Sequence, residues 1–262
     1  MQKSLIFAVA MLVSIGASAQ QTASPSAQSR LGAGYLKPAA MPDALTLLPP
    51  PPAEGSKALA RDRAAEAKAL KLHGTTRWQQ AITDADLFTP KATATFSCAA
   101  GFEISAAETP KIDAILRKVG ADFGLSTYPV KNKYKRPRPF VGNGMPLCTP
   151  NYENVLRSDG SYPSGHSAIG YGWGMILAEI VPKRRSKLLA RGASFADSRR
   201  VCNVHFKSDV EAGGVMAKAV FKALLADPVL QADLAAAKAE ARALAVTKPD
   251  CAAEKAALKM TR

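Results

Sequence analysis

One stretch of the sequence decides the fold: SGHSAIGYGWGMILAEIV, from Ser164 to Val181. It is almost continuously apolar, and Ser164 at its start is a natural helix N-cap. The stretch is too short, and contains too many glycines, for a membrane-spanning segment. It therefore predicts a buried central helix, apolar on all sides because other helices surround it.

Helical patterns also occur upstream of this stretch. Residues 58–72 are rich in Ala, Lys, Arg and Glu, and Thr109-Pro110 offers an N-cap followed by proline at the first helical position. Apolar residues then follow at helical spacing, at Ile112, Ile115, Leu116 and Val119. The pattern predicts two amphipathic helices before the central one.

The downstream part of the chain is helical as well. Ser208 and Glu211 have the spacing of a capping box, which predicts a helix that runs to Asp227-Pro228. This pair can in turn cap an Ala-rich helix that reaches about Ala245. The sequence contains no strand-like alternation of any length and no internal repeat, so it predicts an all-α fold with one helical-bundle domain, residues 57–262.

The N-terminus has the features of an export signal. Lys3 precedes an apolar run, and Ala17-Ser18-Ala19 supplies the small residues that signal peptidase accepts. The run is shorter than the roughly 20 residues that span a bilayer, so residues 1–19 predict a cleaved signal, a periplasmic protein and no membrane anchor. Residues 20–56 are rich in Ser, Ala, Gln and Pro, which favours an extended, flexible N-terminal arm.

Composition limits the function classes. The chain has 262 residues, 47% of them hydrophobic, which excludes a mostly disordered protein. Its formal charge of +14 attracts anions, which could be nucleic acid, acidic membrane or phosphorylated small molecules. Export makes disulfides possible, but four cysteines allow three pairings and the sequence does not select one: Cys98, Cys148, Cys202 and Cys251. The sequence has no CxxC, so neither a redox motif nor a zinc cluster is indicated.

Three short segments carry polar groups that a helical domain does not need for folding. The first is KNKYKRPRP, from Lys131 to Pro139, with five cations in eight positions. Taken alone, it is most simply a solvated basic loop.

The second segment is GSYPSGH, from Gly160 to His166, directly before the central helix. Gly165 lets the backbone approach a ligand closely, and the free N–H groups at a helix start bind anions. His166 would then lie beside the bound anion. A plain N-cap with a partly exposed histidine explains this segment equally well when it is taken alone.

The third segment runs from Ser198 to Asp209 and contains Arg199 and His205. The Asp209 carboxylate can accept a hydrogen bond from Nδ1–H of His205, which leaves Nε2 as a nucleophile or base. The alternative is a structural His–Asp contact. The third histidine, His73, has no partner motif and is predicted to lie on the surface.

Together the segments predict a phosphate-binding cradle that two histidines approach from opposite sides. The predicted cradle residues are Lys131, Arg138, Ser164, Gly165 (through its amide) and Arg199, and the histidines are His166 and His205.

The spacing of these residues resembles a known signature. Its three parts are Lys131 to Arg138-Pro139, then Pro163 to His166, then Ser198-Arg199 to His205 and Asp209. This is similar to the three-part signature of the type 2 phosphatidic acid phosphatase superfamily, which also includes the vanadium haloperoxidases. The form GSYPSGH and the export signal resemble the bacterial class A non-specific acid phosphatases within it.

The resemblance implies a fold and a mechanism. The domain would have the helical-bundle fold of the acid phosphatase and vanadium haloperoxidase type. His205 would attack phosphorus and form a phosphohistidine, Asp209 would hold its tautomer, and His166 would protonate the leaving alkoxide. The cradle cations would stabilise the transferring phosphoryl group, so no metal or other cofactor is expected.

The resemblance also implies partners. Substrates would be a broad range of phosphomonoesters, including nucleotides and aryl phosphates, with phosphotransfer to other alcohols as a possible side activity. Phosphate or vanadate would inhibit, relatives suggest a homo-oligomer, and no nucleic acid is expected as a specific partner. Because one histidine must be protonated while the other is neutral, an acidic pH optimum is expected.

Three alternatives remain at this stage. A vanadium-dependent haloperoxidase would use the same cradle with vanadate bonded to the equivalent of His205, but those enzymes are typically much longer. A membrane lipid phosphatase needs several spanning helices. A non-catalytic basic protein that binds polyanions would account for clusters such as Lys183-Arg184-Arg185 but gives no reason for His166 and the His205–Asp209 pair.

Overall fold

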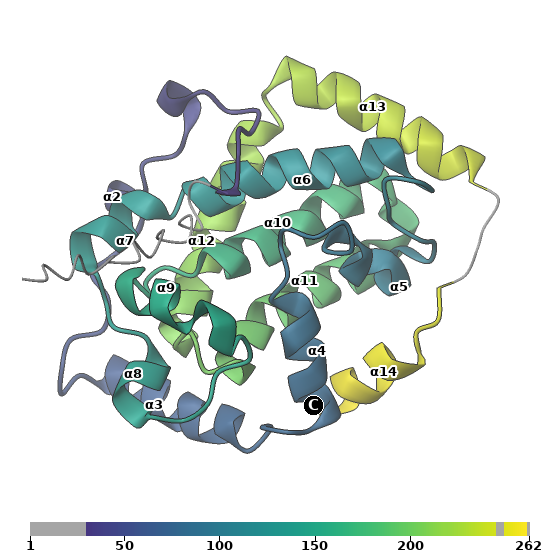
Figure 1. Ribbon diagram of the computed structural model, residues 1–262. Coiled ribbons are helices and arrows are strands. Elements are labelled where there is room, and N and C mark those ends of the chain that lie inside the picture. Colours follow the sequence, from purple (N-terminus) through teal and green to yellow (C-terminus); the bar gives the residue numbers. More distant parts are fainter. Residues whose placement is uncertain (1–29, 245–248, 261–262) are drawn as a thin grey trace, which may run out of the picture.

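The computed structural model describes residues 30–244 and 249–260, and the chain is all-α there, without a strand (Figure 1). The predicted signal, residues 1–19, lies outside the described residues. The α-helices are α2 (Ala44–Leu47), α3 (Lys57–Leu70), α4 (Thr76–Asp84), α5 (Ser97–Ala100), α6 (Pro110–Leu125), α7 (Tyr128–Tyr134), α8 (Pro139–Asn143), α9 (Glu153–Ser158), α10 (Gly165–Ile180), α11 (Arg185–Val201), α12 (Lys207–Leu224), α13 (Pro228–Ala243) and α14 (Ala252–Lys259). Short 3₁₀ turns occupy Pro38–Ala40, Thr93–Phe96, Pro150–Tyr152 and Pro182–Arg184.

Helix α10 is the predicted central helix. It packs against α6, α11 and α12, and α13 covers the outer side of α6 (Figure 1). Ser164 caps it as expected, because its Oγ accepts a hydrogen bond from the Ser167 N–H at 3.2 Å. The apolar stretch is therefore buried by other helices, and no helix of the described residues is long and apolar enough to cross a membrane.

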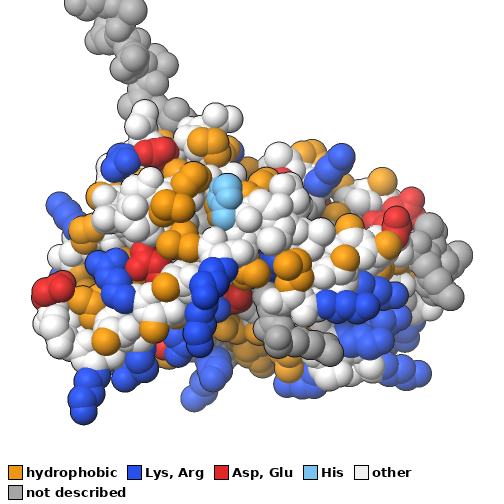
Figure 2. Space-filling model, turned by 90° about the horizontal axis from the view of Figure 1, so that it is seen from below, with side chains coloured by type: hydrophobic (Ala, Val, Ile, Leu, Met, Phe, Trp, Pro, Cys, Tyr) orange, Lys and Arg blue, Asp and Glu red, His pale blue; other side chains and the backbone are white. Residues whose placement is uncertain are grey.

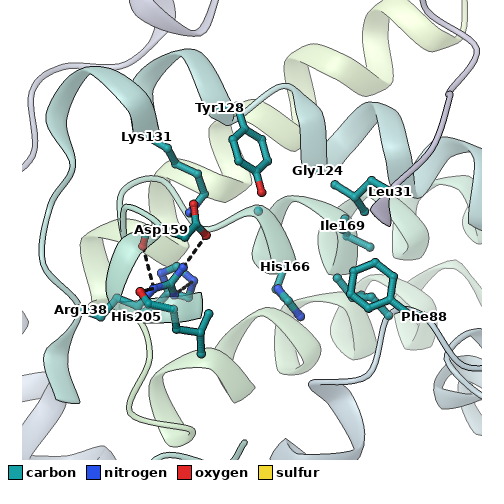
Figure 3. A pocket seen from close by; sticks show the side chains of 13 residues that line it. Leu31, Phe88, Gly124, Tyr128, Lys131, Arg138, Asp159, His166, Ile169 and His205 are labelled. Atoms are coloured by element: carbon teal, nitrogen blue, oxygen red, sulfur yellow. Dashed lines mark hydrogen bonds and ion pairs between the residues drawn. The ribbon is translucent and has the colours of Figure 1, made fainter. Parts of the chain in front are cut away.

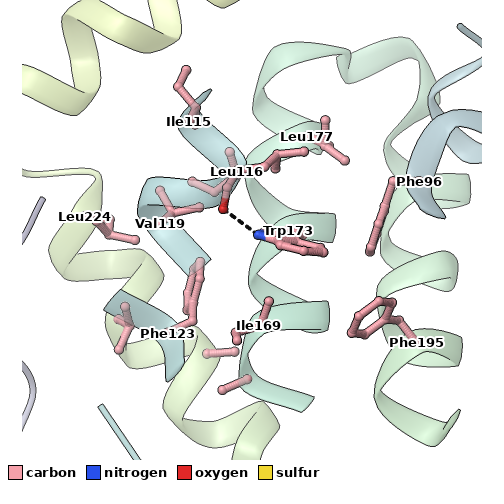
Figure 4. Packing of buried hydrophobic residues seen from close by; sticks show 14 of the residues in the cluster. Phe96, Ile115, Leu116, Val119, Phe123, Ile169, Trp173, Leu177, Phe195 and Leu224 are labelled. Carbon is pink, nitrogen blue, oxygen red and sulfur yellow. Dashed lines mark hydrogen bonds between the residues drawn. The ribbon is translucent and has the colours of Figure 1, made fainter. Parts of the chain in front are cut away.

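The core forms around Trp173 of α10 (Figure 4). Its indole meets the Phe96 ring edge to face and the Phe195 ring at a tilt, and its Nε1–H donates to the Leu116 carbonyl of α6 at 2.6 Å. The four predicted apolar residues of α6 are all buried here. The apolar residues whose helical spacing predicted α6 thus form the face that packs on α10.

Helix α11, which the sequence patterns do not predict, lies unusually close to α10. A Cβ on Gly174 would be 2.8 Å from the Leu188 carbonyl oxygen, and one on Gly192 would be 2.7 Å from the Gly170 carbonyl oxygen. Gly170 and Gly174 of the central stretch are therefore the contact surface for α11. This contact fixes the end of α11, which carries Arg199.

The predicted capping box of α12 is wrong in its residues. The helix begins at Lys207, and the carboxylate that accepts the N-cap N–H is that of Asp209, from Phe206 at 2.8 Å. Ser208 is displaced from the capping role because its Oγ donates to Asp62 of α3, while Glu211 pairs with Lys207 on the surface. Asp209 thus fixes the helix start as well as facing His205. By contrast, Asp227 caps α13 as predicted, at 2.9 Å from the Leu230 N–H, and that helix ends at Ala243.

The structure describes part of the predicted arm, residues 30–56. Residues 30–56 do not extend away: Ala44 and Leu48 are buried in the core. The N–H groups of Tyr35 and Leu36 donate to the Asp122 carboxylate at 2.8 and 3.0 Å. These contacts hold the segment against the domain.

Much of the surface is basic. Figure 2 shows Lys and Arg side chains spread across one face, with fewer acidic side chains between them. His73 is exposed, as predicted, and packs its ring against Trp78. On this face the basic side chains are therefore spread out and do not form one compact patch.

Two disulfides join the four cysteines: Cys98 to Cys251, and Cys148 to Cys202. The first ties α14 to the domain, and Glu254 of that helix adds an ion pair to Arg191 at 3.0 Å. A cross-link across a sequence separation of 153 restricts the unfolded chain strongly.

We expect the double variant Cys98→Ala/Cys251→Ala to lose about 2 to 4 kcal/mol of unfolding free energy. The unfolded chain gains the entropy that the cross-link removes, so the thermal midpoint falls by about 10 °C. Calorimetry at one pH measures this. Activity at room temperature stays unchanged, since neither cysteine lines the cavities described below. An unchanged midpoint would contradict the prediction.

Candidate active site

The three predicted segments meet at the N-terminal end of α10. Lys131 comes from α7, Arg138 precedes α8, and His205 lies in the loop before α12. With Gly165 and His166 they line a cavity of about 50 Å³. Figure 3 shows Lys131, Asp159, Arg138 and His205 on one side, with His166 between them and the apolar residues opposite.

His205 is buried, and its neighbours define its tautomer. A guanidinium can only donate, so the 3.0 Å contact with Nη1 of Arg138 makes Nε2 of His205 an acceptor. Nδ1 then carries the proton and faces Oδ2 of Asp209 at 3.4 Å and Oγ of Ser161 at 3.3 Å. Burial, together with the charges of Arg138 and Lys131, holds the pKa of His205 well below its usual range. The ring is neutral, with the Nε2 lone pair directed toward the cationic side.

Asp209 is fully buried and fully paired. Its Oδ1 accepts from Nη1 of Arg136 at 2.7 Å, and its Oδ2 accepts from the Ser161 hydroxyl and the Phe206 N–H. Arg136 in turn binds Asp62 of α3 at 2.8 Å. The carboxylate that faces His205 is therefore held in one orientation by groups from three separate parts of the chain.

His166 lies in the first turn of α10 and is half-buried. A carbonyl can only accept, so its Nε2–H donates to the Ala85 carbonyl at 3.1 Å, which leaves Nδ1 as the titrating nitrogen. Burial, followed by the charge of Arg199, lowers the pKa of His166 well below its usual range. A neighbouring anion would raise this pKa again.

Lys131 and Arg138 are buried cations that share an acidic neighbour. Nη2 of Arg138 donates to Oδ2 of Asp159 at 2.8 Å, and Nζ of Lys131 lies 3.5 Å from the same oxygen. Lys131 also donates to the Gly160 carbonyl. Burial lowers the pKa of Lys131 to about 8, and Asp159 opposes that shift. Lys131 is therefore charged at acidic and neutral pH.

Arg199 is buried without enough partners. Its Nε and Nη1 find no hydrogen-bond acceptor among the described residues. Burial lowers its pKa to about 9, and the charge of Arg138 acts in the same direction. An unpaired buried guanidinium is costly, and such a group is typical of a site where an anionic ligand supplies the acceptor.

Gly165 lines the small cavity, whereas Ser164, which was predicted to bind phosphate with it, is fully buried and does not line it. The Ser164 side chain is buried and serves the helix cap, and its N–H donates to the Asp209 carbonyl at 3.0 Å. A Cβ on Gly165 would lie 3.3 Å from Oγ1 of Thr127, so the helix start is closely packed. The first N–H groups of α10 have no partner within the helix and are suited to an anion.

A larger cavity of about 360 Å³ adjoins the first, and the two share His166. Its walls are mostly apolar and include Phe88, Tyr152 and Leu156, and the charged residues Arg30, Asp86 and Arg199 also line it. A mostly apolar chamber thus opens next to the titrating histidine.

Sequence reasoning missed three residues of this arrangement: Ser161, Arg136 and Asp159. The first two lie inside the segments that it singled out, so those segments were the available signal. Asp159 stands one residue before GSYPSGH, and no spacing rule indicated it. Among the described residues, no group of three or more His, Cys, Asp or Glu side chains could hold a metal ion.

Comparison with known proteins places the chain in a family. Residues 119–230 match the PAP2 superfamily. The chain is 39% identical to a non-specific acid phosphatase of Providencia stuartii over 207 residues, 79% of this chain and 84% of that protein. It is also 39% identical to an acid phosphatase of Zymomonas mobilis over 202 residues (76% and 75%), and 37% identical to a non-specific acid phosphatase of Salmonella typhimurium over 194 residues (74% and 78%).

The chain belongs to the PAP2 superfamily and, within it, to the bacterial class A non-specific acid phosphatases. It is an enzyme that hydrolyses phosphomonoesters. The predicted family and the all-α fold are confirmed.

Proposed function

We propose that this enzyme hydrolyses a broad range of phosphomonoesters through a phosphohistidine on His205, without a metal ion. The observation that carries the proposal is the orientation of His205. Its Nδ1 is backed by buried Asp209 and its Nε2 faces the cations, next to an Arg199 with unpaired buried donors. A neutral nucleophile, a fixed tautomer and a cationic anion site are what in-line phosphoryl transfer to histidine needs.

In the first step, Nε2 of His205 attacks phosphorus and the bond from phosphorus to the leaving oxygen breaks. Nδ1–H stays on the ring, and Asp209 balances the positive charge that the ring acquires. His166, protonated at Nδ1, gives its proton to the leaving oxygen.

In the second step, neutral His166 takes a proton from water, and the water oxygen attacks phosphorus. The P–N bond breaks, inorganic phosphate forms and His205 returns to its neutral state. An alcohol in place of water would give phosphotransfer by the same route.

The cations act on the phosphoryl oxygens in both steps. Lys131, Arg138 and Arg199 would hold these oxygens, with the Gly165 amide at the start of α10, and Ser164 would fix that helix start. Donors that are buried before the reaction cost little reorganisation during it. They supply the charge stabilisation that a metal ion gives elsewhere.

The leaving group would occupy the larger cavity beside His166 and Arg199. Its apolar and aromatic walls, with Phe88 and Tyr152, place few polar demands on the alcohol. This supports broad use of phosphomonoesters, aryl phosphates included. Inorganic phosphate and vanadate would bind the same cations and inhibit.

Export to the periplasm is part of the proposal. The two disulfides support it, because such bonds persist in oxidising compartments. The homo-oligomer stays a prediction.

Hydrolysis of p-nitrophenyl phosphate at about pH 5.5, with and without EDTA, tests the proposal. We expect equal turnover with and without EDTA. With a substrate that carries radioactive phosphorus, we expect a labelled phosphoenzyme after a rapid quench, stable in alkali and hydrolysed in acid. Loss of activity in EDTA that added metal restores would contradict metal independence. Oxidation of bromide in the presence of vanadate and peroxide would instead favour a haloperoxidase. The relatives named above are acid phosphatases and do not favour that alternative.

A further inference from the structure

An acidic side chain, Asp159, occupies the cationic side of the proposed phosphate site. Its Oδ2 accepts from Nη2 of Arg138 at 2.8 Å and lies 3.5 Å from Nζ of Lys131 (Figure 3). Its backbone carbonyl also accepts from Nε of Arg138, at 3.0 Å. One carboxylate oxygen thus binds two of the three cations assigned to phosphate.

A carboxylate oxygen and a phosphoryl oxygen have the same need for these donors. Arg138 is already engaged by the Val204 carbonyl and His205 through Nη1, so Nη2 is the donor most open to exchange. A phosphoryl group that binds Lys131 and Arg138 must therefore compete with Asp159 for them.

The surroundings of Asp159 allow it to give way. It lies at the C-terminal end of α9, a six-residue helix with no buried residue, and its side chain is 21% exposed. Among the described residues, its carboxylate has no hydrogen-bond or ion-pair partner other than Lys131 and Arg138.

The backbone after Asp159 is held firmly. A Cβ on Gly160 would lie 2.8 Å from the Lys131 carbonyl oxygen, and the Ser161 N–H donates to the Arg136 carbonyl at 2.8 Å. These contacts fix Gly160 and Ser161, so we expect a displacement of Asp159 from the cations to involve its side chain and α9 only.

We propose that Asp159 sets the anion affinity of the active site by competing with the phosphoryl group for Lys131 and Arg138. This inference rests on the proposed function, because it takes those cations as phosphate ligands. Asp159 weakens substrate binding and speeds the release of inorganic phosphate by replacing it on the two cations. It is a positioning residue and acts on affinity, not on the bond that breaks.

The test is the variant Asp159→Asn, which keeps the size of the side chain and removes its charge. We expect the inhibition constant of inorganic phosphate to fall about tenfold, the size of effect that a partly screened, close ion pair supports. KM for p-nitrophenyl phosphate falls in parallel, and kcat does not rise because product leaves more slowly. The work is done at about pH 5.5, where Lys131 remains charged without its acidic partner.

Glu153→Gln is the matched control. It removes the same charge from the same helix, but the Glu153 side chain is 36% exposed, and its only ion pair among the described residues is with Arg157. We expect its phosphate inhibition and KM to equal those of the wild type. Asp159→Ser, which removes both the charge and the reach, should repeat the effect of Asn.

Titration calorimetry with inorganic phosphate distinguishes an Asp159 that competes with phosphate from an Asp159 that only supports Lys131 and Arg138. Tighter phosphate binding in both Asp159 variants supports the proposal. Unchanged or weaker binding overturns it and makes Asp159 a support for the two cations. Failure of the wild type itself to bind phosphate would overturn the proposed function first.

Discussion

We expect His205→Ala to abolish phosphomonoester hydrolysis, with kcat for p-nitrophenyl phosphate reduced about 10⁴-fold or more. The variant lacks the atom that would bond to phosphorus, and the other imidazole of the small cavity, that of His166, donates its Nε2–H to the Ala85 carbonyl. Asp209, Arg136 and Ser161 remain, but the ring that Asp209 orients is no longer there. The labelled phosphoenzyme should disappear together with turnover.

The third histidine provides the control for this loss. His73→Ala removes an exposed ring that lines neither cavity, and it should leave kcat and KM unchanged. Because His205 is buried, its removal could also unfold the domain, so circular dichroism and the thermal midpoint accompany the assay. A folded His205→Ala protein that still turns over at more than about one hundredth of the wild-type rate would reject the nucleophile.

The central and flanking helices could be predicted because their signals are local. Ser164 and Asp227 cap their own helices, and the apolar face of α6 follows the helical period. Helix α11 could not be predicted, since the burial of its polar side chains depends on partners that are distant in the sequence. Arg191 is buried in it through ion pairs to Asp84 and Glu254, which lie far away in the sequence. A polar sequence that is neutralised by remote charges gives no local pattern.

The site, too, has residues that local spacing predicts and contacts that it does not. The spacing of Lys131 to Arg138 and of His205 to Asp209 predicted side chains that the fold does bring together. The pairing of Arg136 with Asp62 of α3 and the two disulfides are long-range choices, and spacing does not determine them. Asp159 was not predicted because the site was located by its clustered cations, and an acidic residue does not fit that pattern. Its proposed role is to set the anion affinity of the site, and the site can form without it.

The remaining large effect concerns His166 and depends on the leaving group. We expect His166→Ala to lower kcat/KM about 10³-fold for an alkyl phosphate such as glycerol 2-phosphate, and only about tenfold for p-nitrophenyl phosphate. An alkoxide needs a proton as it leaves, whereas p-nitrophenolate is stable without one. A plot of log kcat/KM against the leaving-group pKa should therefore steepen in the variant.

The pH dependence gives a second readout of the same proton. The pKa of His166 is lowered by burial and by Arg199, so its acid form is present only at low pH and is lost as the pH rises through that pKa. Bound phosphoryl oxygens raise the pKa again in the substrate complex, which gives the wild type an acidic optimum on alkyl phosphates. The variant should lose this decline toward higher pH, because the group that titrates is gone. Equal losses on both substrates, or a wild-type rate on alkyl phosphates that keeps rising above neutral pH, would remove the acid role from His166 and leave it as part of the cavity wall.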